Sequence, residues 1–334
     1  MNFLLAPISW IYGLVVWIRN LLYDEHILFS TKVSIPTICV GNLAVGGTGK
    51  TPMTEYLVSL LSKQYKVAVL SRGYGRRTKG FRLANAHDTA KTIGDEPMQI
   101  HTHFPEIPVA VSADRVKGVK RLQQLFPDLQ CIILDDAYQH RPLRCGMYIL
   151  LTPYDRLYVH DHMLPWGRLR DIPSQSFRAN MVVVTKCPKQ MQPIERRVVA
   201  NALSLPSYQQ LVFSRIAYQP LVLPGTPLLV TGIANPQPML EYLREQYPNC
   251  ELLAFPDHHM FTDNDLERIC SKAKQYDCIL TTEKDYMRLQ QTPLFEQLES
   301  KLYIQTIQTD FGIDKENFDR QVLLYVSENN RTKK

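Results

Sequence analysis

Val45-Gly46-Gly47-Thr48-Gly49-Lys50-Thr51 is the stretch that decides the fold of this 334-residue chain. It follows an apolar, β-branched run at residues 33–40 and opens a helix-like pattern at residues 51–62. A strand, a glycine-rich loop, Lys-Thr and a helix in that order form a phosphate-binding P-loop. The glycines let backbone N–H groups surround a polyphosphate, and the helix N-terminus adds partial positive charge. The sequence therefore predicts a nucleotide-binding loop made of Gly46, Gly47, Thr48, Gly49, Lys50 and Thr51.

Two side chains of this loop have predicted roles in phosphate chemistry. Lys50 can reach the β- and γ-phosphates of a nucleotide, and the hydroxyl of Thr51 can ligate Mg²⁺. The loop departs from the usual G-x-x-x-x-G-K-[ST] pattern, because Ala44 stands at the first glycine position and Gly41 lies three residues earlier. A glycine-rich turn before an ordinary helix is the alternative interpretation, which the flanking strand and helix patterns disfavour.

The composition is that of a globular protein, with 45% hydrophobic and 21% charged residues. A formal net charge of +6 favours acidic partners in general, namely phosphates, anionic lipid or nucleic acid, or else an ordinary mildly basic enzyme. The seven cysteines are odd in number and form no C-x-x-C pair. This pattern indicates free thiols in a reducing compartment.

The N-terminal segment is apolar and uncharged from residue 2 to residue 18. It lacks the basic region of a secretory signal, and Pro7 and Gly13 interrupt a run already marginal for spanning a bilayer. Trp10, Trp17 and Arg19 suit a lipid–water interface. We therefore expect a membrane-surface helix within residues 1–28, with a helix packed on the protein's own core as the alternative.

Strand and helix signals alternate along the rest of the chain, which predicts βαβ units and a mostly parallel sheet. The strand candidates of the first part are residues 33–40, 66–70, 108–112, 130–134, 147–151 and 180–185. A proline- and glycine-rich stretch then leads to a new αβ pattern from about residue 223. The predicted fold is α/β: a P-loop NTPase-like core with helices on both sheet faces at residues 29–222, and a smaller α/β domain at residues 223–334.

Carboxylates follow two of these elements. Asp135 and Asp136 end an apolar run as a Walker B strand does, and Asp95 and Glu96 follow Gly94 at a helix start. Carboxylates beside a P-loop can ligate Mg²⁺ or accept a proton from an acceptor hydroxyl. The predicted metal site therefore comprises Thr51, Asp135, Asp136 and Glu96. Turn opening and helix capping are the alternative roles of these acids.

The second domain carries Asp257-His258-His259 in a loop before a capped helix start at Thr262. The sequence lacks a Cys/His set with zinc spacing, so a histidine that assists proton transfer is the functional interpretation. A purely structural role for Asp257 and His259 is the alternative.

Together these motifs resemble one family, the tetraacyldisaccharide 4′-kinases. In chain order the matching motifs are Gly41-Asn42, Gly46 to Pro52, Ser71-Arg72-Gly73-Tyr74-Gly75, Gly94-Asp95-Glu96-Pro97, Leu134 to Arg141, Leu164-Pro165, Leu169-Arg170-Asp171, Thr231 to Pro236, Phe255 to His259 and Thr281 to Asp285. Two departures stand out. Ala137 and Tyr138 replace the usual Gly-Phe, and Asp171 replaces a Glu.

The resemblance implies an ATP-dependent lipid kinase of lipid A (lipopolysaccharide) biosynthesis. Its reaction would transfer the γ-phosphate of ATP, with Mg²⁺, to the 4′-hydroxyl of a tetraacyldisaccharide 1-phosphate, giving lipid IVA. It also implies a membrane-associated enzyme on the cytoplasmic face of the inner membrane, either peripheral or held by a single N-terminal anchor, without a nucleic-acid partner.

The same resemblance implies roles for individual residues. Asp95 would be the catalytic base, supported by His258, while Lys50 and Arg170 neutralise phosphate charge. Contacts to the lipid substrate would come from Arg72, Tyr74 and Asp171.

A deviant-P-loop ATPase acting as a membrane-associated switch is the alternative function. Such proteins carry a Lys immediately before Gly-Gly-x-Gly-Lys-Thr, whereas this chain has Val45 there.

Overall fold

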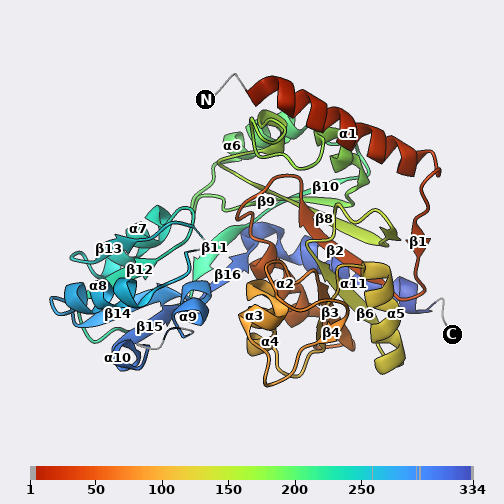
Figure 1. The fold of residues 1–334 in the computed structure, drawn as a ribbon. Coiled ribbons are helices and arrows are strands. Elements are labelled where there is room, and N and C mark those ends of the chain that lie inside the picture. The colour runs from red at the N-terminus through yellow and green to blue at the C-terminus, as the bar shows by residue number, and fades with distance from the viewer. Residues whose placement is uncertain (1–4, 258, 291, 293–294, 332–334) are drawn as a thin grey trace. The chain divides into compact units, whose positions relative to one another are not determined.

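The computed structural model describes residues 5–257, 259–290, 292 and 295–331, and Figure 1 shows their elements. The chain forms two compact units. The first comprises Met1–Ala217 together with Thr309–Lys334, and the second comprises Tyr218–Gln308.

An eight-stranded sheet organises the first unit, with strand order β10-β9-β8-β2-β6-β3-β5-β4. The strands are β2 (Thr37–Asn42), β3 (Val67–Ser71), β4 (Arg82–Leu83), β5 (Val109–Val111), β6 (Cys131–Asp135), β8 (Met147–Pro153), β9 (Met181–Thr185) and β10 (Gln210–Phe213). Neighbouring strands pair in parallel except β4, which is antiparallel to β5. The predicted mostly parallel sheet is confirmed.

Helices cover both faces of this sheet, as predicted. They are α2 (Lys50–Leu61), α3 (Ala90–Ile93), α4 (Asp95–His103), α5 (Arg115–Leu125), α6 (Pro193–Leu203) and α11 (Lys315–Arg331). On β2, Cys39 joins the core cluster that includes residues of α5 and α6, while Ile38 and Val40 join the cluster that includes residues of α2, α4 and α11. Alternate side chains of the strand are thus buried on opposite faces, which is why it reads as a continuous apolar run.

The end of the chain belongs to the first unit, whereas residues 223–334 were predicted to form one domain. Phe318, Val322 and Val326 of α11 are fully buried in the same cluster as Leu57 of α2. Burial of these three side chains explains why the last helix packs on the main sheet. The first unit also contains a short parallel pair, β1 (Thr31–Lys32) with β7 (Leu143–Arg144), and 3₁₀ turns at Tyr158–His160, Pro173–Arg178 and Gly312–Asp314.

Helix α1 (Ala6–Asp24) presents two different faces. Ser9, Val16 and Asn20 are buried. The large apolar side chains of the helix that remain at least 40% exposed are Ile8, Trp10, Ile11, Leu14, Val15, Trp17, Ile18 and Leu21. Across the described residues, no helix combines the length and apolarity needed to traverse a bilayer.

The second unit is a smaller α/β structure. Its parallel sheet has the order β13-β12-β14-β15, from strands β12 (Pro227–Thr231), β13 (Glu251–Ala254), β14 (Cys278–Thr282) and β15 (Leu302–Gln305). Its helices are α7 (Gln237–Gln246), α8 (Asp263–Ala273), α9 (Glu283–Leu289) and α10 (Glu296–Glu299). A separate two-stranded sheet, β11 (Arg215–Tyr218) with β16 (Ile307–Asp310), forms where the chain passes between the units.

Candidate active site

The glycine-rich loop connects β2 to α2 as predicted. Gly46 and Gly49 have φ values of +108° and +89°, which side-chain-bearing residues rarely adopt, and α2 starts at Lys50. The hydroxyl of Thr185, at the end of β9, donates to the carbonyl oxygen of Thr48 at 2.9 Å. The neighbouring strand therefore helps to hold the loop in place.

The glycine needed before the loop is Gly41, not residue 44. A Cβ atom on Gly41 would lie 2.5 Å from Cβ of Tyr138, which leaves no room for a side chain. Tyr138 is itself fully buried, and its hydroxyl donates to the carbonyl oxygen of Gln175 at 2.7 Å. That bond gives the buried tyrosine hydroxyl a partner, so its burial leaves no polar atom unsatisfied.

Asp135 ends β6 in a buried polar pocket. Its carboxylate accepts from the hydroxyls of Ser71 at 3.1 Å and Thr54 at 3.4 Å. Burial, together with the negative charges of Asp136 and Glu96, raises the pKa of Asp135 to about 6. Glu96 thus lies close enough to interact with Asp135, although it belongs to the first turn of α4.

Asp136 has the opposite electrostatic setting. Burial opposes its ionisation, but the charges of Lys50 and Arg170 outweigh burial and hold the pKa of Asp136 below its usual value. Arg170 binds this carboxylate with both terminal nitrogens, Nη1 to Oδ2 at 3.1 Å and Nη2 to Oδ1. Lys50 Nζ is 3.9 Å from Oδ1 of Asp136. The predicted phosphate-binding cations therefore share one carboxylate beside the P-loop.

Asn42 connects the same two cations; the sequence analysis includes it in a matching motif but assigns it no role in the site. Its Oδ1 accepts from Arg170 Nη2 at 2.7 Å and from Lys50 Nζ at 3.4 Å. Its position as the last residue of the strand before the P-loop is the signal that would have found it. The sequence analysis also assigns no role to Lys186, the residue directly after β9. Its Nζ lies 3.8 Å from the position that a Cβ atom on Gly47 would occupy, so this cation is beside the P-loop.

The loop after β3 and the start of α4 approach each other closely. A Cβ on Gly94 would lie 3.0 Å from the carbonyl oxygen of Tyr74 and 3.2 Å from Cα of Gly73. Asp95 and Glu96 form the first turn of α4 and are half-buried, whereas Arg72 and Tyr74 are exposed. The structure thus brings the predicted base and two predicted substrate contacts to neighbouring positions.

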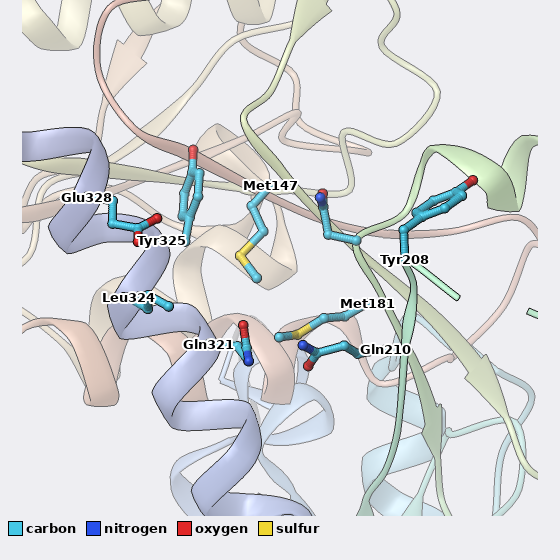
Figure 2. Close-up of a pocket in the computed structure, with 9 residues that line it drawn as sticks. Met147, Met181, Tyr208, Gln210, Gln321, Leu324, Tyr325 and Glu328 are labelled. Carbon is cyan, nitrogen blue, oxygen red and sulfur yellow. The ribbon is translucent and has the colours of Figure 1, made fainter. Parts of the chain in front are cut away.

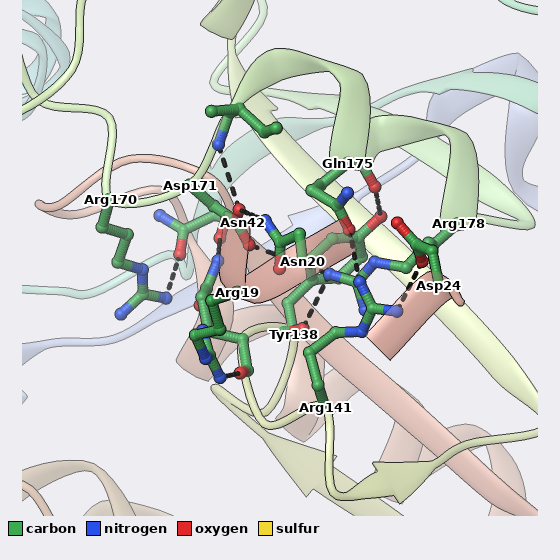
Figure 3. Close-up of polar contacts among 12 residues, drawn as sticks. Arg19, Asn20, Asp24, Asn42, Tyr138, Arg141, Arg170, Asp171, Gln175 and Arg178 are labelled. Atoms are coloured by element: carbon green, nitrogen blue, oxygen red, sulfur yellow. Dashed lines mark hydrogen bonds and ion pairs between the residues drawn. The ribbon is translucent and has the colours of Figure 1, made fainter. Parts of the chain in front are cut away.

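Asp171 lies elsewhere in the site. It is fully buried, and its Oδ1 accepts from Nδ2 of Asn20 in α1 at 2.7 Å. Figure 3 shows Asp171 facing Asn20, while the side chain of Arg170 extends toward Asn42.

The second unit assembles its own motifs at the carboxyl ends of its strands. The buried carboxylate of Asp285 accepts from the hydroxyls of Thr231 and Thr282, both at 2.7 Å, and from the backbone N–H of Gly232 at 3.0 Å. His259 Nε2 lies 2.9 Å from Oδ2 of Asp265, within the capped start of α8. These contacts support the structural interpretation of His259, whereas His258, the predicted partner of Asp95, lies outside the described residues.

A cavity of about 220 Å³ lies at the amino ends of strands β8, β9 and β10, away from the carboxyl ends that carry the P-loop. Figure 2 shows Met147, Met181 and Gln210, from the beginnings of β8, β9 and β10, facing Gln321 and Tyr325 of α11. The P-loop and the acids described above follow the carboxyl ends of the strands, where ligands of open parallel sheets bind. This cavity therefore does not belong to the candidate active site.

A P-loop on a mostly parallel sheet, with a carboxylate shared by a lysine and an arginine beside it, defines a nucleotide-binding P-loop protein. Comparisons with known proteins identify the family. The model of the family described as "Tetraacyldisaccharide-1-P 4'-kinase" matches residues 1–327. The chain belongs to this family, and the function predicted from the sequence, an ATP-dependent lipid kinase, is confirmed at that level.

Individual relatives agree with this assignment. The tetraacyldisaccharide 4'-kinase of Flavobacterium johnsoniae is 46% identical over 98% of this chain and 97% of its own length. That of Bacteroides thetaiotaomicron is 43% identical over 98% of this chain and 94% of its own length. The crystal structure of LpxK from Aquifex aeolicus in complex with ATP has a TM-score of 0.73 and 24% identity, covering 96% of this chain and 98% of that one.

Proposed function

We propose that the chain transfers the γ-phosphate of ATP to the 4′-hydroxyl of a tetraacyldisaccharide 1-phosphate at the site formed by the P-loop, Asp136 and Arg170. The observation that carries this proposal is the joint contact of Lys50 and Arg170 with Asp136. Two cations preassembled beside the loop match the charge that spreads over a transferring phosphoryl group. ATP displaces Lys50 and Arg170 from Asp136 in part, because its phosphates compete for the same cations.

Mg²⁺ is the metal that the site suits. The hydroxyl of the buried Thr51 at the start of α2 and the carboxylate of Asp135 at the end of β6 are hard oxygen donors of the kind that P-loop proteins offer this ion. Arg170 already binds the carboxylate of Asp136, so we assign Asp135 as the carboxylate nearest to the metal. Glu96, which interacts with Asp135, is the other carboxylate that could ligate the ion. The bound ion would neutralise charge on the β- and γ-phosphates.

Asp95 is our candidate for the base that accepts the 4′-hydroxyl proton, with His258 as its support. Its place in the first turn of α4, beside the exposed loop of Arg72 and Tyr74, suits a residue that meets an incoming sugar. A placed general base contributes roughly 10²–10⁴-fold to such a step. Arg72 and Tyr74 would contact the disaccharide.

The base assignment is tested by steady-state kinetics of Asp95→Asn with ATP and the disaccharide acceptor. We expect a loss of kcat of at least roughly 10²-fold with little change in the KM for ATP. A kcat close to that of the wild type would transfer the base role to Glu96 or one of the two aspartates after β6.

We also propose that α1 lies in the membrane surface through its exposed apolar side chains. Trp10 and Trp17 are 69% and 49% exposed, which is unusual for tryptophan unless it meets another apolar phase. An interfacial helix would hold the enzyme at the surface that contains its acylated substrate.

This part is tested by flotation with vesicles of mixed neutral and anionic lipid. The double variant Trp10→Ser/Trp17→Ser should no longer float with the vesicles. A double substitution of polar residues elsewhere on the surface should float as the wild type does. Equal flotation of both proteins would refute membrane contact through α1.

A further inference from the structure

The segment at residues 168–171 pairs with the strand end that leads into the P-loop. The backbone N–H of Arg170 donates to the carbonyl oxygen of Leu43 at 2.8 Å, and that of Val45 donates to the carbonyl oxygen of Arg168 at 2.8 Å. Ala44 and Leu169 form an antiparallel bridge between these bonds. Any shift of the segment therefore also shifts the residues just before Gly46.

The other side of the same segment is held by α1. Nδ2 of Asn20 donates to Oδ1 of Asp171 at 2.7 Å, and the hydroxyl of Tyr12 donates to the carbonyl oxygen of Arg170 at 3.1 Å. Asn20 is 1% exposed and Asp171 is 0% exposed, so water does not substitute for their hydrogen bond. Figure 3 shows the arrangement, with Asp171 directed to α1 and Arg170 directed away from it.

The buried carboxylate of Asp171 has few other partners. Its Oδ1 accepts from the backbone N–H of Ile172 at 3.0 Å, and Arg178 Nη2 is 3.9 Å from Oδ2. Oδ2 makes no hydrogen bond within the described part of the chain. A buried charged acceptor that loses a donor is costly, so removal of the Asn20 amide should displace the segment or admit water.

We infer that α1 positions the phosphate site: the Asn20–Asp171 hydrogen bond holds the 168–171 segment so that Arg170 reaches Asp136 and Asn42. Asn20 and Asp171 are then positioning residues, a role that differs from the direct substrate contact predicted for Asp171. The kinetic consequence rests on the proposed function, whereas the structural link does not.

Amide hydrogen exchange tests the structural link without any assumption about the reaction. In Asn20→Ala, the amides of Val45 and Arg170 should exchange roughly tenfold faster than in the wild type. The matched control is Asp24→Ala, which removes another α1 contact, the ion pair with Arg141 at 2.6 Å, without touching residues 168–171. Unchanged exchange in Asn20→Ala, or the same acceleration in both variants, would overturn the proposal.

Kinetics test the consequence for catalysis. Asn20→Ala should lower kcat about tenfold with the KM for ATP nearly constant, and it should have no further effect in an Arg170→Ala background. Asp171→Asn, which retains an acceptor for Asn20, should keep more activity than Asp171→Ala. An equal loss of kcat with and without Arg170 would mean that α1 acts by another route.

A milder variant protects the test against misfolding. Tyr12→Phe removes only the hydroxyl that contacts Arg170 and should shift both readouts in the same direction by a smaller factor; no shift in either readout would count against the proposal. If the wild type transfers no phosphate to the disaccharide, the proposed function fails, while the exchange comparison still decides the link.

Discussion

Arg170→Ala isolates the contribution of the cation pair beside the P-loop. Arg170 makes a charge-assisted contact with Asp136 and a 2.7 Å hydrogen bond with Asn42. During the reaction we expect its guanidinium to leave Asp136 and to bind the transferring phosphoryl group instead. A hydrogen bond to a charged group contributes about 1.5–3 kcal/mol. If that contact is made in the transition state only, its loss lowers kcat by roughly 10- to 150-fold and leaves the KM for ATP almost unchanged.

The assay is initial-rate kinetics over a range of ATP concentrations at saturating acceptor. Arg170→Lys should recover only part of the rate, because an ammonium cannot bind a carboxylate or phosphate with two parallel donors. Arg196→Ala is the matched control: it removes a comparable Arg–Asp ion pair, with Asp314 at 2.6 Å, that contacts none of the P-loop residues. A kcat within about threefold of the wild type for Arg170→Ala, or an equal loss of kcat in Arg196→Ala, would refute a role of Arg170 in phosphoryl transfer.

Three further predictions concern the loop, its packing and its acids. Lys50→Ala should lower the transfer rate by more than about tenfold without changing the thermal unfolding midpoint, and a smaller loss would remove Lys50 from the phosphate site. Gly41→Ala should lower the free energy of unfolding in urea by ~1–3 kcal/mol, because the added Cβ meets Tyr138 at 2.5 Å; Gly13→Ala, where the nearest atom is 3.5 Å away, should not. The pKa of Asp135 is raised to about 6 in the folded state, so the folded protein favours the protonated carboxyl. The contribution of this protonated carboxyl to the unfolding free energy is complete below the unfolded-state pKa and is lost as the pH rises through about 6. In metal-free protein, Asp135→Asn should therefore gain unfolding free energy relative to the wild type between pH 4 and pH 7, up to roughly 3 kcal/mol, and a pH-independent difference would contradict the assigned burial.

The sequence predicted those parts of the fold that are determined by residues close together in the chain. Buried β-branched runs identified the central strands, and the glycine-rich stretch located the nucleotide loop, because both signals are local. The edge strand β13 (Glu251–Ala254) was not predicted, because periodicity alone cannot assign an apolar run as short as Leu252-Leu253-Ala254 to a strand rather than to a helix. Local patterns also gave no sign that α11 returns to the first unit.

The contacts that organise the candidate site join residues far apart in the chain. Asn20 and Asp171 are separated by 151 positions, and Asn42 and Arg170 by 128. No periodicity or motif spacing encodes such pairs, because they follow from how α1 and the 168–171 segment pack on the sheet. The resemblance supplied the identity of Arg170 and Asp171, but the difference between their environments appears only in the structure.

Transfer of labelled γ-phosphate from ATP to a tetraacyldisaccharide 1-phosphate tests the central claim most directly. The purified chain, with Mg²⁺ and the acceptor in mixed micelles, should place one labelled phosphate on the 4′-hydroxyl, and Asp95→Asn and Arg170→Ala should each reduce the rate. ATP hydrolysis without a labelled lipid, accompanied by nucleotide-dependent dimerisation, would contradict the account and favour a P-loop switch instead.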